Sequence, residues 1–300
     1  MQSLKGKLAL VAGATRGAGR GIACMLGEAG ATVYCTGRST RARRSHPRES
    51  GSPFSLQHRR ETIEETAELV NTYGGVGIPV CVDHTVEDEV KALFERVTAE
   101  YGQLDILVND IWGGDELTEW GKPFWELELS KGWLMQERAV RSHIITSRYA
   151  AGLMIEQSGG LIIEITDGVD DRYRGNLFYD LAKLSVIRLA YTMSEELRPH
   201  NIAAIAVTPG FLRSEAMLEH FGVTPRNWQD GANKDPHFIA SETPFYIGRA
   251  IAALSADPNI MQKSGRVFSS WGLAQEYGFT DIDGRQPNWG KYFLENVATH

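Results

Sequence analysis

Tyr179 and Lys183 are the residues whose types and spacing point most directly to chemistry. They lie four positions apart in a segment that opens a predicted long helix, so both side chains are expected on one helix face. An unperturbed tyrosine, with a pKa of about 10, is a poor base at neutral pH. A neighbouring ammonium group stabilises the phenolate, so this pair is suited to protonate a carbonyl oxygen or to deprotonate an alcohol. The same spacing is also common on solvated helix faces.

A glycine-rich turn lies near the start of the chain, between a short apolar run and a predicted helix. Gly13, Gly17 and Gly19 are spaced as glycine, three residues, glycine, one residue, glycine, with Thr15 and Arg16 inside the turn. Such a turn lets backbone N–H groups and the positive end of a helix approach a pyrophosphate. The spacing differs from the G-x-G-x-x-G fingerprint, and a plain tight turn is the alternative. Its place after the first strand favours dinucleotide binding.

Arg38 ends the second apolar run, at the position that faces the adenosine ribose in dinucleotide-binding folds. An acidic residue there would bond the 2′-hydroxyl of NAD, whereas an arginine suits a 2′-phosphate. No Asp or Glu occurs between Tyr34 and Arg38, and Arg16 is a second nearby cation. The sequence therefore favours NADP(H) over NAD(H). Arg41, Arg43 and Arg44 are interpreted as a solvated charge run.

The surrounding chain alternates strand-length apolar runs with helical patterns. The predicted strands are Leu8–Val11, Ala31–Cys35, Val76–Val82, Leu104–Val108, Leu161–Ile165, Ile202–Val207 and Arg266–Phe268. Predicted helices include 61–73 and 86–101, the second opened by a capping-box spacing at Thr85 and Asp88. Near-continuous Val, Ile and Leu are typical of strands buried on both faces. We therefore predict an α/β fold over residues 1–300, a single Rossmann-type doubly wound parallel sheet of about seven strands flanked by helices.

Two segments interrupt this alternation. Residues 39–60 are polar and predict an inserted loop, and residues 212–239, which contain Phe221, Trp228 and Phe238, form a candidate substrate lid. Trp112, Trp120, Trp125 and Trp133 cluster after the fourth strand and predict core packing, a subunit contact or an apolar pocket.

Composition excludes several other classes of protein. The net charge of −7 argues against nucleic acid as a partner. No apolar stretch approaches the roughly 20 residues that span a membrane. Cys24, Cys35 and Cys81 are odd in number and lie in apolar runs, which favours reduced, buried thiols and a cytoplasmic location. No metal site is expected.

Further landmarks occur in the order found in a known family. Asp83 ends the third strand, Asn109 the fourth, and Pro209-Gly210 follows the sixth. With the glycine turn and the Tyr179–Lys183 pair, residues 5–270 resemble the short-chain dehydrogenase/reductase family. The resemblance implies an NAD(P)-dependent oxidoreductase acting on CH–OH or C=O groups of a small molecule. It also implies a homodimer or homotetramer, and it places Asp83, Asn109, Pro209, Gly210 and Lys183 along the cofactor, Lys183 on the nicotinamide ribose.

The sequence departs from the family pattern at two positions. Asp167 stands where the family has a serine that donates a hydrogen bond to the substrate oxygen, and an ionised carboxylate cannot donate one. Asp167 at a strand end is expected to be partly buried and protonated, or else ionised against Arg172 or Arg174, with Thr166 as the donor; a different mode of substrate binding is the third alternative.

The second departure is Ala139, which stands where the family has an asparagine that helps a proton relay. His143, one turn on, is either its replacement or a structural histidine. These departures sustain a rival hypothesis, a weakly active or inactive NADP(H)-binding sensor or scaffold.

Overall fold

The computed structural model describes residues 3–42 and 60–297, and within them seven parallel strands form one sheet. Their order across the sheet is β3-β2-β1-β4-β5-β6-β7. The strands are β1 (Leu8–Ala12), β2 (Thr32–Gly37), β3 (Val76–Cys81), β4 (Ile106–Asn109), β5 (Gly160–Ile165), β6 (Ile202–Thr208) and β7 (Val267–Ser269). All seven predicted strands and the doubly wound architecture are confirmed, because continuous apolar runs suit strands that helices cover on both faces.

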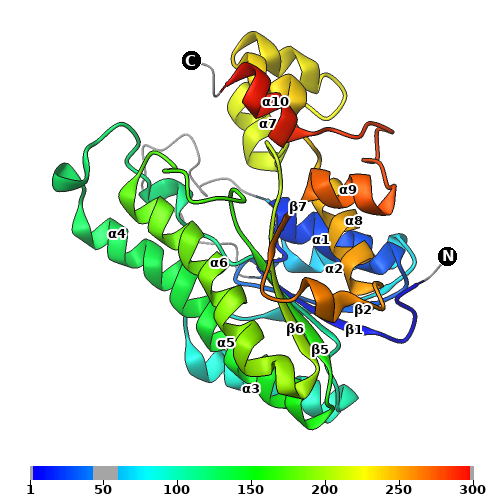
Figure 1. The fold of residues 1–300 in the computed structure, drawn as a ribbon. Helices are drawn as coiled ribbons and strands as arrows, with labels where there is room; N and C mark the ends of the chain where they lie inside the picture. The colour runs from blue at the N-terminus through cyan, green and yellow to red at the C-terminus, as the bar shows by residue number, and fades with distance from the viewer. Residues whose placement is uncertain (1–2, 43–59, 298–300) are drawn as a thin grey trace.

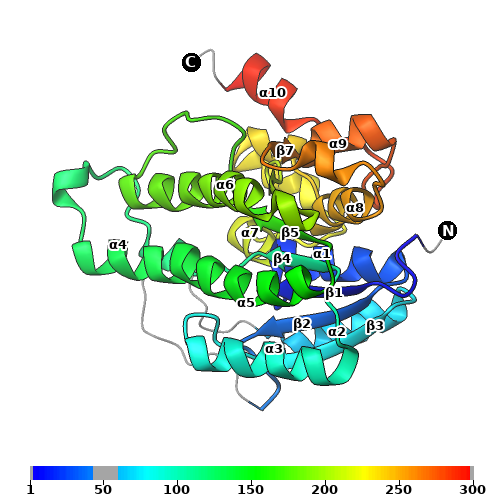
Figure 2. The same cartoon turned by 60° about the horizontal axis from the view of Figure 1, so that its bottom comes forward.

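Helices cover both faces of this sheet (Figures 1 and 2). One face packs against α1 (Gly17–Glu28), α2 (Ile63–Thr72), α8 (Pro244–Ser255) and α9 (Ser270–Tyr277). The other packs against α3 (Glu87–Tyr101), α5 (Ser142–Glu156) and α6 (Leu177–Leu197). Alternate residues of β1 divide between the two cores: Ala9 and Val11 on one side, Leu8 and Leu10 on the other.

The helix before β5 is continuous but changes its winding. α4 (Leu129–Gln136) passes through a π-helical turn (Glu137–Arg141) directly into α5. The predicted position of the missing family asparagine, Ala139, lies in this turn and is buried. Single π turns inside α-helices often mark functional sites.

The candidate lid has structure and a small core of its own. It contains α7 (Glu215–Phe221) and two 3₁₀ helices, Trp228–Asn233 and Pro236–Ala240. Phe221, Trp228 and Phe238 are buried together. The C-terminal helix α10 (Trp289–Asn296) packs on this segment, with the Trp289 ring against Phe211 and the Tyr292 ring against His237.

Two local predictions were wrong. Thr85 does not cap α3: its backbone N–H and hydroxyl both donate to the Asp83 carboxylate, so the cap position falls on Val86 without a side-chain bond. A capping box does occur on α2, between Thr62 and Glu65. Cys24 and Cys35 are buried as expected, but Cys81 is exposed because it ends an edge strand.

Most of the predicted polar loop, residues 43–59 with Arg43 and Arg44, lies outside the described residues. Among the residues that the structure places, no helix is long and apolar enough to cross a bilayer.

Candidate active site

The glycine turn lies at the carboxyl edge of the sheet and connects β1 to α1. Gly13 has a φ of +93° and Gly17 a φ of +58°, a region that favours glycine. A Cβ atom on Gly13 would lie 2.5 Å from the main-chain oxygen of Asp110, so a side chain is excluded there. Thr15 packs its hydroxyl against Gly37, close enough that a Cβ on Gly37 would lie 2.6 Å from it. The turn thus requires glycine at Gly13 and begins α1 with a residue that has no side chain, Gly17.

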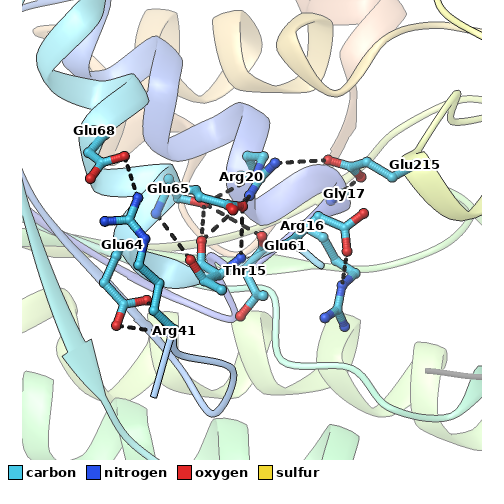
Figure 3. Close-up of polar contacts among 12 residues, drawn as sticks. Thr15, Arg16, Gly17, Arg20, Arg41, Glu61, Glu64, Glu65, Glu68 and Glu215 are labelled. Atoms are coloured by element: carbon cyan, nitrogen blue, oxygen red, sulfur yellow. Dashed lines mark hydrogen bonds and ion pairs between the residues drawn. The ribbon is translucent and has the colours of Figure 1, made fainter. Parts of the chain in front are cut away.

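A carboxylate from the lid segment reaches this helix terminus (Figure 3). The N–H of Gly17 donates to Oε2 of Glu215 at 2.8 Å, and the Arg20 guanidinium lies 3.8 Å from the same carboxylate. Arg20 also pairs with Glu65 at 3.1 Å, and Arg16 lies 3.6 Å from Glu61. Glu215 and Arg20 were not predicted as site residues, since Glu215 and Gly17 are distant in sequence.

Arg38 and Asp83 lie side by side at the ends of β2 and β3. The Nη1 of Arg38 is 3.5 Å from Oδ2 of Asp83, and the arginine side chain is 45% exposed. Arg41 instead binds Glu68 at 2.6 Å and is exposed, as a solvated charge would be. Arg38 is therefore available at the edge where an adenosine ribose is expected, and its neighbour is a carboxylate.

Tyr179 and Lys183 share one face of α6 and meet Asp167, which follows β5. The Tyr179 hydroxyl donates to Oδ2 of Asp167 at 2.8 Å. The Tyr179 ring lies between the rings of Trp112 and Trp120, with centroids 5.4 and 5.1 Å away. The Lys183 ammonium lies 3.9 Å from the centroid of the Trp112 ring. The structure thus brings Tyr179 and Lys183 together with Asp167, the residue that stands where the family has a serine.

The charges around this pair set its acid–base behaviour. Burial, then the charge and hydrogen bond of Asp167, raise the pKa of Tyr179 well above its ordinary value. Burial lowers the pKa of Lys183, while Asp167, Asp115 and Asp110 oppose that shift. Asp110 lies close by: burial raises its pKa to about 7 against the opposing effects of Lys183 and the Gly19 N–H. With this surrounding, Tyr179 keeps its proton at neutral pH.

The expected environment of Asp167 needs correction. Asp167 is exposed rather than partly buried. Arg172 pairs with Asp170, and the Arg174 guanidinium binds the main-chain oxygen of Asp167 at 2.6 Å and the Asp180 carboxylate at 3.1 Å. The carboxylate of Asp167 therefore faces Tyr179 instead of an arginine.

The hydroxyl of Thr166 is turned into the protein. Thr166 is 2% exposed and its Oγ1 donates to the main-chain oxygen of Lys183 at 2.7 Å. That bond ties the end of β5 to the first turns of α6. Its proton is engaged inside the fold, which favours Asp167 over Thr166 as the group that faces a substrate.

Asn109 belongs to a buried polar network. It is 0% exposed, and its amide donates to Ser147 and to Oε1 of Glu164, both at 2.8 Å. Nδ1 of His143 lies 2.5 Å from Oε2 of Glu164, and its Nε2 lies 3.0 Å from the main-chain oxygen of Ile111. Both ring nitrogens of His143 thus have partners inside the fold, as a structural histidine would, and the role expected for Asn109 along the cofactor stays a prediction.

Gly210 packs against the C-terminal helix. A Cβ atom there would lie 2.6 Å from the Cβ of Trp289 on α10. Its N–H donates to the buried carboxyl of Glu242 at 2.9 Å, and burial raises the pKa of that carboxyl to about 8. Pro209 and Gly210 thus join β6 to the lid and to the C-terminal helix.

The residues present fit a dinucleotide. A Cβ on Gly17 would meet only Ser214 at 3.9 Å, the Gly17 N–H binds a carboxylate as it would a phosphate, and Arg38 lies at the end of β2 where the ribose is expected. With an adjacent Tyr–Lys pair, this fold and site define a Rossmann-type oxidoreductase that uses a nicotinamide cofactor.

Comparison with known proteins agrees. A family model described as short chain dehydrogenase matches residues 48–221, and the chain belongs to the short-chain dehydrogenase/reductase family. It is 36% identical over 287 residues to dehydrogenase/reductase SDR family member 1 of Mus musculus, covering 94% of this chain and 85% of the relative. The human protein of that name is 34% identical, covering 99% and 90%. A short chain dehydrogenase of Mycobacterium thermoresistibile superposes with a TM-score of 0.75 at 22% identity, covering 96% and 92%.

Proposed function

We propose that this oxidoreductase uses NADP(H) to move a hydride between the nicotinamide ring and the carbon of a carbonyl or alcohol group. The observation that carries the proposal is the Tyr179–Lys183 pair on one face of α6, with the Tyr179 hydroxyl on Asp167 just after β5. A bound nicotinamide supplies or accepts the hydride. Consumption of NADPH with a panel of aldehydes, ketones and quinones tests the proposal, and no consumption with any of them would count against it.

In this proposal Tyr179 holds the proton that the substrate oxygen receives. Its raised pKa keeps the phenol protonated at neutral pH, which suits a general acid in the direction of reduction. Lys183 holds the nicotinamide ribose and keeps a positive charge near the phenol oxygen. Thr166 positions this pair by fixing the carbonyl of Lys183.

The lid segment closes the substrate end of the site in the same proposal. Glu215, the first residue of α7, already contacts the N–H of Gly17. That N–H is the kind of group a glycine turn offers to a diphosphate, so cofactor binding and the Glu215 contact compete for it. The position of the lid is thereby linked to the cofactor.

Self-association fits the exposed apolar side chains of the helices near the site. Leu181 and Tyr191 on α6 and Ile144 on α5 are 47, 42 and 48% exposed. Exposed apolar residues on neighbouring helices favour a homo-oligomer built on this face.

We expect NADPH to bind more tightly than NADH because Arg38 can pair with the 2′-phosphate. Changing Arg38 to Asp should remove or reverse that preference, a change of at least about tenfold in the ratio of dissociation constants measured by calorimetry. Arg198→Asp, at an exposed arginine paired with Glu195, is the matched control and should leave the ratio unchanged. Equal affinities for the two cofactors in the unaltered protein would contradict this assignment.

Asp167 and Thr166 have separable effects on turnover. Asp167→Asn removes a negative charge that raises the pKa of Tyr179, so that pKa falls and the loss of reductase activity at high pH begins at a lower pH. Thr166→Ala should cost about 1 kcal/mol of stability and change turnover by less than about threefold. Turnover profiles from neutral to alkaline pH for both variants provide the comparison. If Thr166→Ala removes activity while Asp167→Asn leaves the profile unmoved, the threonine is the substrate donor.

A further inference from the structure

The Asp167 carboxylate is only partly used by the protein. Oδ2 accepts the Tyr179 hydroxyl at 2.8 Å, and within residues 3–42 and 60–297 no hydrogen bond to Oδ1 is found. The side chain is exposed, and the nearby Arg174 guanidinium is held by main-chain oxygens and by Asp180. One oxygen of Asp167 is therefore open to a molecule that lies against Tyr179.

Several carboxyl groups lie at this end of the site. Lys183 is the cation beside the catalytic tyrosine, and three carboxyl groups act on it: Asp167, Asp115 and Asp110. Asp110 is only partly ionised at neutral pH, because its pKa is raised to about 7. Arg174 also acts on Lys183, but its guanidinium is paired with Asp180 at 3.1 Å. Among residues 3–42 and 60–297, neither Asp115 nor Asp167 forms a salt bridge. A developing negative charge on a substrate oxygen is opposed by this arrangement, whereas a second positive charge is favoured.

Aromatic rings line the same space and already hold a cation. The Lys183 ammonium lies 3.9 Å from the Trp112 ring centroid, within the range of a cation–π interaction. The centroid of the Trp120 ring lies 5.1 Å from that of Tyr179, and Trp120 is 54% exposed. Trp120 thus contacts the Tyr179 ring while Asp167 accepts its hydroxyl, so an exposed aromatic ring and an anionic group both adjoin Tyr179. These are the two groups that bind ammonium ions.

We infer that the substrate carries a positively charged nitrogen on the carbon next to the reacting carbon, as in an amino ketone or the corresponding amino alcohol. The substrate oxygen lies on the Tyr179 hydroxyl, and the ammonium group lies on Asp167 and Trp120. Because the phenol and carboxylate oxygens are 2.8 Å apart, groups on neighbouring carbons reach both. The inference rests on the proposed function, since it names the substrate class of that site. The inference gives a reason for the carboxylate of Asp167 at the position where the family has a serine hydroxyl.

Binding of a matched pair of compounds tests the inference without requiring turnover. The probes are 2-amino-1-phenylethanol and 1-phenylethane-1,2-diol, which differ by an ammonium in place of a hydroxyl group. Calorimetry on the full chain at pH 7, with and without NADP⁺, should give at least about fivefold tighter binding of the amino alcohol. In Asp167→Ser the difference should shrink to less than about twofold. Asp170→Ser, which removes a carboxylate of the same loop that pairs with Arg172, should keep the preference.

Kinetics with the same compounds separate this inference from the proposed function. Preferred oxidation of the amino alcohol, lost in Asp167→Ser, supports both. Preferred binding of the amino alcohol without any turnover supports the ammonium site and contradicts the proposed reaction. Equal binding of the two probes, or a preference that Asp167→Ser leaves intact, overturns the inference even if neutral carbonyl compounds are reduced.

Discussion

Tyr179→Phe is expected to lower turnover by at least about a hundredfold while the affinity for NADPH changes by less than about threefold. The substitution removes the hydroxyl that carries the proton and keeps the ring that packs between Trp112 and Trp120. General acid–base groups typically contribute about 10²–10⁴ to the rate, so the loss should fall in this range. Steady-state kinetics with a carbonyl compound that the unaltered protein reduces measures turnover. Calorimetry measures the affinity for NADPH.

Tyr173→Phe is the matched control, because Tyr173 lies in the loop between β5 and α6 and is 66% exposed. It should turn over at the rate of the unaltered protein. Full activity in Tyr179→Phe would mean that another acid protonates the substrate. Absence of activity in the unaltered protein, with tight NADPH binding, would support the hypothesis of a sensor or scaffold instead.

His143→Leu is expected to lower the free energy of unfolding by about 3 kcal/mol. Glu164 is completely buried in β5, and the main-chain oxygen of Ile111 can only accept a hydrogen bond, so Nε2 of His143 carries a proton. The Nδ1 of His143 lies 2.5 Å from Oε2 of Glu164. Without the imidazole, Oε2 of the buried Glu164 carboxyl loses its partner, while Oε1 keeps Asn109 and Ser147, and the Ile111 carbonyl loses its donor. Urea unfolding monitored by circular dichroism measures the loss.

A second substitution distinguishes a broken pair from a poorly packed leucine. In the double variant His143→Leu with Glu164→Gln a neutral amide replaces the buried carboxyl, and its oxygen can still accept from Asn109 and Ser147, so it should be more stable than His143→Leu alone. His200→Leu, at an exposed histidine on the surface, should change stability by less than about 0.5 kcal/mol. If His143→Leu lowers the free energy of unfolding by less than about 1 kcal/mol, the network contributes little to stability. His143 would then be a candidate for the proton-relay role of the family asparagine.

Local patterns in the sequence determined the sheet and the pairing of Tyr179 with Lys183. Seven apolar runs gave seven strands because a strand buried on both faces excludes polar side chains along its length. The four-residue spacing placed Tyr179 and Lys183 on one face of α6, since helical geometry relates nearby residues directly. The glycine turn followed from backbone angles that side chains disfavour. Each of these depends on residues that are close along the chain.

The immediate partners of the site residues were decided only by the tertiary structure. Glu215 reaches Gly17 across most of the chain, and Trp289 sets the size of Gly210 from the C-terminal helix. Even within one loop, Asp83 took the Thr85 hydroxyl that the local pattern assigned to a helix cap. Asp167 turned to Tyr179 instead of an arginine because Arg174 is held by Asp180 and by carbonyl oxygens. Hydrogen-bond partners depend on which groups folding leaves within reach, and that is a property of three-dimensional packing rather than of spacing along the chain.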